Sequence, residues 1–110
     1  MALDKLDSVD TVGIEKDTGF AVLTIADSWD WADEPKHLLA LQAKLNAYFG
    51  FIESGQILED YPDAAGRPLV IDVEGRFPIP KVGVDFLKRA SESGANMGVT
   101  VRSRHYPGSQ

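Results

Sequence analysis

The sequence contains no cysteine and no long apolar segment. Without cysteine there is no disulfide framework, no thiolate zinc site and no cysteine nucleophile. No apolar run approaches the roughly 20 residues that a helix needs to cross a bilayer. The first ten residues, MALDKLDSVD, are acidic and lack the uninterrupted apolar core of a secretory signal. We therefore expect a cytoplasmic protein that has no membrane partner.

Sequence signatures of known chemistry are missing as well. There is no GxxxxGK[ST] or GxGxxG phosphate-binding loop and no GxSxG nucleophile elbow. The serines have no His and Asp at a spacing that would indicate a catalytic triad. These absences predict no cofactor, no metal and no catalytic residues, and they favour a protein that is not an enzyme.

The charge of the chain is negative and unevenly distributed. The formal net charge is -6, and residues 1–34 carry nine acidic residues against two lysines. The remaining residues carry eight acidic and nine basic residues. Binding to a nucleic-acid backbone needs a basic surface, so nucleic acid is not expected as a partner. An acidic surface permits a basic protein partner, although it also serves simply to keep a protein in solution.

Length and composition predict one globular domain over residues 1–110. A chain of 110 residues, with 44% hydrophobic and 25% charged residues, is long enough for one hydrophobic core and too short for two. We expect residues 1–7 and 106–110 to be flexible, as chain ends often are.

The strongest local signal is that of a helix over residues 33–55. Asp33 is suited to cap its N-terminus, Pro35 to its first turn, and Gly55 to the left-handed conformation that ends it. Lys44 is expected on the polar side of this helix. The apolar residues that recur at spacings of three or four, and so predict its buried face, are Leu38, Leu41, Leu45, Tyr48 and Ile52.

The remaining patterns predict five strands and a second helix. The strands are expected over residues 9–16, 20–26, 56–61, 69–77 and 96–105, and the helix over 81–92. A turn at residues 16–19 joins the first two strands into a hairpin. The order ββαββαβ indicates an α+β two-layer sandwich: a sheet of about five strands, antiparallel or mixed, with both helices on one face. Without the first strand the order is that of ferredoxin-like folds, so a ferredoxin-like relative is an alternative.

The connection between the second strand and the long helix is a candidate site. Trp29 and Trp31 are expected to bury much of their area, either as a lid over the helix start or as an aromatic patch that binds a partner. His37 follows Asp33 by one helical turn, so the two could form a hydrogen-bonded general base. The simpler interpretation places His37 on the surface beside a helix cap.

Acidic residues are also clustered at this connection. Asp27, Asp30 and Asp33 could offer carboxylates to a hard cation. Their spacing does not match a calcium-binding loop, and the glycine of such a loop is missing. We therefore expect no metal here.

A second candidate surface follows from alternation in the last two strands. Residues 69–77 alternate between apolar and charged side chains, which predicts one covered face and one face exposed to water. Opposite charges on the last two strands suggest that these strands are neighbours. The polar face is either a binding platform or a solvated surface that prevents aggregation. Its residues are Asp72, Glu74, Arg76, Arg102 and Arg104.

The run LTIADSWDWADEPKHLLALQAKLNAYFGFIESG carries a distinctive pattern, LTI-D-x-x-D-W…HL-x-x-LQ-x-KLN-x-Y…FIESG. With it, the chain resembles a family of small single-domain bacterial proteins of unknown function. Residues 61–64 and 66–67 also fit, so the resemblance covers nearly the whole chain. It implies a bacterial, soluble protein and supplies no activity.

Together these observations favour a non-enzymatic protein-interaction module whose partner is another protein or a second copy. A specific version is an acidic inhibitor of a basic protein, such as an immunity protein that neutralises a toxin. The binding surface would be the polar sheet face or the acidic corner at residues 29–33. The alternative is a small-molecule or metal-dependent enzyme with Asp27, Asp30 and His37 at its site.

Overall fold

The computed structural model describes residues 11–105, so the chain ends that we expected to be flexible, 1–7 and 106–110, lie outside the described residues. Four strands and three α-helices form in this part of the chain. In order they are β1 (Thr11–Ile14), β2 (Ala21–Asp27), α1 (Glu34–Glu53), α2 (Gln56–Asp60), a 3-10 turn η2 (Pro62–Ala64), β3 (Leu69–Gly75), α3 (Lys81–Ala95) and β4 (Val99–His105).

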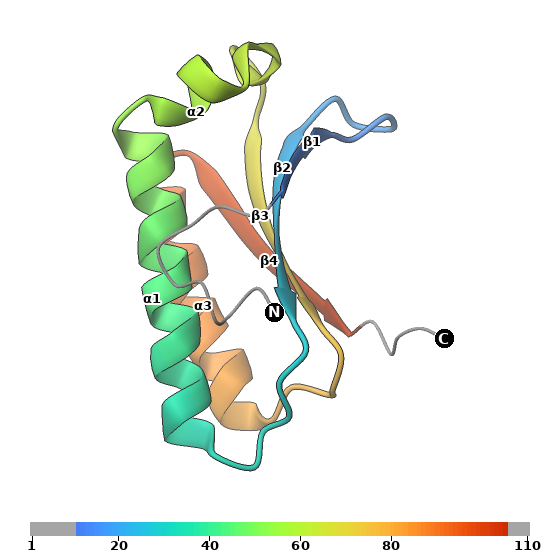
Figure 1. Ribbon diagram of the computed structural model, residues 1–110, viewed down its shortest axis with the longest axis vertical. Helices are drawn as coiled ribbons and strands as arrows, with labels where there is room; N and C mark the ends of the chain where they lie inside the picture. Colours follow the sequence, from blue (N-terminus) through green and yellow to red (C-terminus); the bar gives the residue numbers. More distant parts are fainter. Residues whose placement is uncertain (1–10, 106–110) are drawn as a thin grey trace.

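The strands form one mixed sheet in the order β1-β2-β3-β4. The first two strands form the predicted antiparallel hairpin, whereas β2, β3 and β4 are parallel. Both crossovers between parallel strands step across the sheet in the same direction, so right-handed connections place α1 and α3 on the same face. Figure 1 shows the two helices on one side of the sheet. The two-layer α+β architecture is therefore confirmed.

The adjacency of the last two strands is also confirmed. Asp72 pairs in register with Arg102, and Glu74 pairs with Arg104, as the opposite charges suggested. Because these strands are parallel neighbours, the sheet does not have the ferredoxin-like arrangement that we considered as an alternative.

The prediction of a strand over residues 56–61 is wrong, and with it the prediction of a fifth strand. Gly55 takes the left-handed conformation, with φ of 84°, and the chain then forms helix α2. Tyr61 N–H donates to the Ile57 carbonyl at 2.7 Å, so local hydrogen bonds replace sheet bonds. Of the apolar pair in this segment, Ile57 is buried while Leu58 is 48% exposed, which a single helical turn can accommodate.

The core lies between the sheet and α1, with α3 beside it. Leu41, Leu45 and Tyr48 are buried as predicted, and the Tyr48 hydroxyl donates to the Thr24 carbonyl of β2 at 2.8 Å. Lys44 is fully buried, contrary to the expectation that it lies on the polar side. Its position three residues after Leu41 and four before Tyr48 puts it on the buried face, whatever its charge.

Candidate functional site

The connection from β2 to α1 is held together by a buried pair of side chains. The His37 Nε2 atom lies 2.6 Å from Asp27 Oδ2, and these residues are 1% and 3% exposed. The other ring nitrogen, Nδ1, lies 2.9 Å from the backbone carbonyl of Asp30. The last residue of β2, the loop and the first turn of α1 are thus joined through one imidazole ring.

The contacts of His37 determine where its protons are. A carbonyl oxygen can only accept, so Nδ1 carries a hydrogen and donates it to Asp30. The short contact between Nε2 and the Asp27 carboxyl then requires one more proton, on either the imidazole or the carboxyl. Burial raises the pKa of Asp27 above its ordinary value of 3.8, and the hydrogen bond from His37 opposes that rise. Asp27 and His37 are therefore joined by a short hydrogen bond in a water-poor environment.

Two tryptophan side chains surround this pair. Trp31 stacks on the His37 ring, with ring centres 3.7 Å apart and planes 17° apart. Trp29 lies tilted against the same ring at 5.6 Å. Trp31 also rests on α3 at Gly83, where an added Cβ would lie 2.9 Å from the indole. The absence of a side chain at Gly83 is what lets the connection pack against α3.

The acidic residues of the connection do not converge. Asp33 caps α1 as predicted by accepting from the Lys36 N–H at 3.2 Å, so it is not the partner that we proposed for His37. Asp30 accepts from the Ala32 N–H at 3.0 Å. Residues 11–105 contain no group of three His, Asp or Glu side chains that could hold a metal ion.

The geometry of Asp27 and His37 indicates a structural role: the pair holds the end of β2 against the start of α1, and we call it a clamp. A general base needs a free lone pair within reach of substrate, whereas both ring nitrogens of His37 face protein oxygens. The adjacent surface pocket, about 320 Å³, is lined by Trp29, Asp30, Ala32, Asp33 and Lys36 and does not include the ring of His37. Trp29, Asp30 and Asp33 therefore border a shallow pocket that the buried Asp27–His37 pair does not line.

The polar face of the sheet carries an ion-pair network. The Arg104 Nη2 atom donates to Asp72 at 2.8 Å, and Arg102 Nη2 donates to Glu15 at 3.0 Å. Arg102 also lies 3.6 Å from Asp72. Glu15 belongs to the turn after β1, and sequence spacing offered no indication that it would reach β4. The Thr18 hydroxyl and the Arg102 guanidinium lower the pKa of Glu15.

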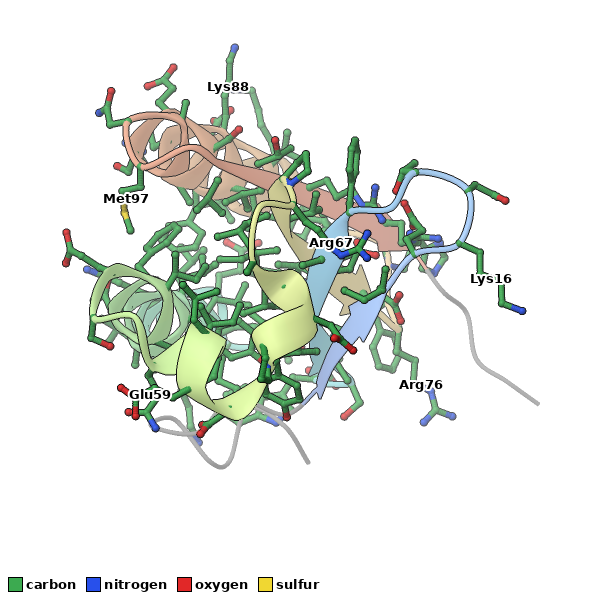
Figure 2. All side chains as sticks on the ribbon, turned by 90° about the horizontal axis from the view of Figure 1, so that it is seen from above. Lys16, Glu59, Arg67, Arg76, Lys88 and Met97 are labelled. Carbon is green, nitrogen blue, oxygen red and sulfur yellow. The ribbon has the colours of Figure 1, made fainter. Side chains whose placement is uncertain are left out.

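This face is less exposed than the alternation of residues 69–77 predicted. Asp72 is only 1% exposed, contrary to our expectation of a carboxylate in water, because the arginines of β4 lie over it. Glu74 is half-buried, and burial, followed by the neighbouring Asp72, raises its pKa. Arg76 is exposed, and Figure 2 shows it extending away from the rest of the molecule. Four of the five predicted residues thus belong to one cluster, and Arg76 stands apart.

A third surface was missed by our sequence analysis. Residues 45–66 contain four acidic residues and no Lys, Arg or His. Figure 1 shows the end of α1, α2 and the following turn together at one end of the molecule. We call this surface the acidic end; its residues are Glu53, Leu58, Glu59, Asp60, Tyr61 and Asp63. The absence of Lys, Arg and His from residues 45–66 is the sequence feature that could have indicated this surface.

The acidic end combines charge with exposed apolar groups. Leu58 is 48% and Tyr61 38% exposed, and Tyr61 makes an edge-on contact with Phe51. A pocket of about 440 Å³ opens between α1 and α2, with Phe51, Asp60 and Tyr61 among its lining residues. The last turn of α1 has no basic residue, so the negative end of its dipole adds to the acidic charge.

The fold and these surfaces define an α+β protein whose mixed four-stranded sheet is covered by helices on one face. The chain belongs to the family DUF6572, described as a family of unknown function, whose model matches residues 1–106. This confirms the resemblance to a family of small proteins of unknown function. Searches of curated proteins and of solved structures find no match. Among residues 11–105, no helix has the length and apolar character needed to cross a membrane.

Proposed function

We propose that this protein is a non-enzymatic protein-interaction module that binds a basic partner through its acidic end. The observation that carries the proposal is the coincidence of four carboxylates, two exposed apolar side chains and a pocket on one surface. Apolar anchors supply binding energy at a protein interface, and complementary charge selects and steers the partner. An acidic inhibitor of a basic protein would bind in this way.

The basic residues that flank the acidic end in the sequence, Lys44 and Arg67, do not cover its carboxylates. Lys44 is fully buried on α1. Arg67 donates to the backbone carbonyls of Asp63 and Gly19, so its guanidinium is held beside the 3-10 turn. In Figure 2, Glu59 projects outward from α2, while Arg67 lies close to the sheet. A cation from a partner could therefore approach Glu59 and Asp60 directly.

The alternative, an enzyme with its site at Asp27, Asp30 and His37, has less support. The side chains of all three residues accept or donate hydrogen bonds within the connection. Neither Asp27 nor His37, which are buried and paired with each other, is left to hold a substrate or to move its proton without rearrangement of the connection.

The proposal can be tested with the purified full-length chain, immobilised and exposed to native lysate. The variant Glu59→Lys/Asp60→Lys reverses charge at the acidic end, and Asp17→Lys/Asp85→Lys makes the same change in charge at exposed positions elsewhere. We expect the parent chain to retain a protein that added salt releases. The variant at the acidic end should fail to retain this protein, and the control variant should retain it. Equal retention by all three chains, or equal loss with both variants, would contradict binding at the acidic end.

A further inference from the structure

Strand β4 forms one edge of the sheet, and no described strand lies beyond it. Its seven residues pair with β3 on one side only. An edge strand of this length presents a row of backbone N–H and C=O groups with which another extended chain can pair. The other edge strand, β1, has four residues within the described part of the chain.

A groove runs beside this edge, between β4 and α3. Its volume is about 480 Å³. The apolar part of its lining is made by Val84, which is 52% exposed, together with Leu87 and Val101. The polar part of its lining is made by Lys88, Ser91, Glu92, Arg102 and Ser103, and Figure 2 shows Lys88 extending outward from α3. We call this feature the edge groove.

We propose that β4 receives an extended segment of a partner protein as a fifth strand, and that this segment alternates apolar with acidic residues. Successive side chains of a strand point to opposite faces of the sheet. One set would enter the edge groove and contact Val84 and Val101. The other set would lie on the opposite face, beside Arg102 and Arg104.

The charge on β4 supports an acidic partner. An added strand would lie about 4.8 Å from β4 and about twice that distance from the backbone of β3. On the face opposite the edge groove, β4 itself contributes Arg102 and Arg104, which are 33% and 49% exposed. A guanidinium has five N–H donors, and the ion pairs of both residues use Nη2. Arg102 Nε is buried, so the donors that remain for carboxylates of the partner are Nη1 of Arg102 and the other guanidinium nitrogens of Arg104.

The same arginines disfavour a second copy as the occupant. If two β4 strands pair antiparallel about Arg102, the two copies of this residue lie directly opposite each other. If they pair about Ser103, each Arg102 faces an Arg104. Like charges at opposite positions destabilise strand pairing. A heterologous acidic strand avoids this repulsion. The edge groove is distinct from the acidic end, so the two proposals can fail separately.

The test uses the ¹⁵N-labelled full-length chain and two capped octapeptides, one alternating Val with Glu and the other alternating Val with Lys. We expect the Val-Glu peptide to shift the amide resonances of β4 and α3 and to slow hydrogen exchange along β4. The Val-Lys peptide should bind at least about tenfold more weakly, a difference of about 1.4 kcal/mol. Equal binding of both peptides, or no protection of β4 at millimolar peptide, would overturn the proposal.

A matched pair of variants locates the contact. Val84→Asp puts a charge in the edge groove at a half-exposed position, while Leu39→Asp makes an equivalent change on α1, where Leu39 is 67% exposed. We expect Val84→Asp to weaken the Val-Glu peptide about tenfold and Leu39→Asp to leave it unchanged, with both variants retaining the circular-dichroism spectrum of the parent. Equal effects of the two variants would contradict binding in the groove. Protection of β4 that rises with protein concentration in the absence of peptide would identify a second copy as the occupant and refute the proposal.

Discussion

The buried pair of Asp27 and His37 leads to the sharpest prediction about stability. Asp27→Ala removes the group that faces His37 Nε2 at 2.6 Å and also the acceptor of the Trp29 N–H at 3.2 Å. Because His37 is 1% exposed, water cannot easily replace the lost partner. Asp27→Asn keeps the shape of the side chain, and its amide can donate to Nε2 while its oxygen accepts from Trp29.

The expected magnitudes differ between the two variants. A buried polar atom left without a partner costs about 1–3 kcal/mol, and the lost Trp29 bond about 1 kcal/mol more. Asp27→Ala should therefore lower the free energy of unfolding by about 2–4 kcal/mol. Asp27→Asn exchanges a charge-assisted hydrogen bond for a neutral one and should cost about 1 kcal/mol. Domains of this size are typically stable by about 5–15 kcal/mol, so both variants should fold.

Urea denaturation followed by tryptophan fluorescence and by circular dichroism measures these differences. The two tryptophans of the chain both contact His37, so fluorescence reports on this connection while circular dichroism reports on the helices. The two transitions should coincide if unfolding is cooperative. Asp33→Asn serves as a control, because Asn caps a helix about as well as Asp. Equal stability of Asp27→Ala and Asp27→Asn would refute the assignment of the pair as a clamp.

Four further predictions concern pH and glycine. Burial raises the pKa of Asp27 above 3.8. The stability of the parent relative to Asp27→Asn should therefore decrease as pH rises from about 4 through the folded-state pKa of Asp27. Urea denaturation at a series of pH values measures this difference. Glu15 has a lowered pKa, so the stability lost in Glu15→Gln should be present at neutral pH and disappear as pH falls well below 4.5; a pH-independent difference would contradict this. Gly50→Ala meets nothing within 4 Å and should stabilise α1 by about 0.5–1 kcal/mol. Gly94→Ala places a Cβ 2.8 Å from the Val99 carbonyl and should destabilise the protein by about 1–3 kcal/mol. If thermal denaturation shows a higher melting temperature for both glycine variants, the contact at Gly94 relaxes without cost and this prediction is wrong.

Local chemistry was sufficient to predict much of the architecture. The helix over residues 33–55 carries its own start and stop signals. Asp33 caps its N-terminus, and Gly55 takes the left-handed conformation after its end. The β1–β2 hairpin was indicated by the turn residues at 16–19, which lie in the connection between the two strands. The adjacency of β3 and β4 was visible in their opposite charges. Each of these features depends on side chains that are close in sequence or paired one to one across strands.

The sequence by itself determined the periodic elements and the acidic character of the chain, because periodicity, capping and net charge depend only on the residues themselves. The tertiary structure decided which polar groups are buried: Lys44 and Asp72 are inside, and His37 pairs with Asp27 instead of Asp33. It also turned residues 56–60 into a helix and left β4 at the edge of the sheet. Burial and pairing between distant residues depend on how whole elements pack, and a single sequence read by local rules does not contain that information.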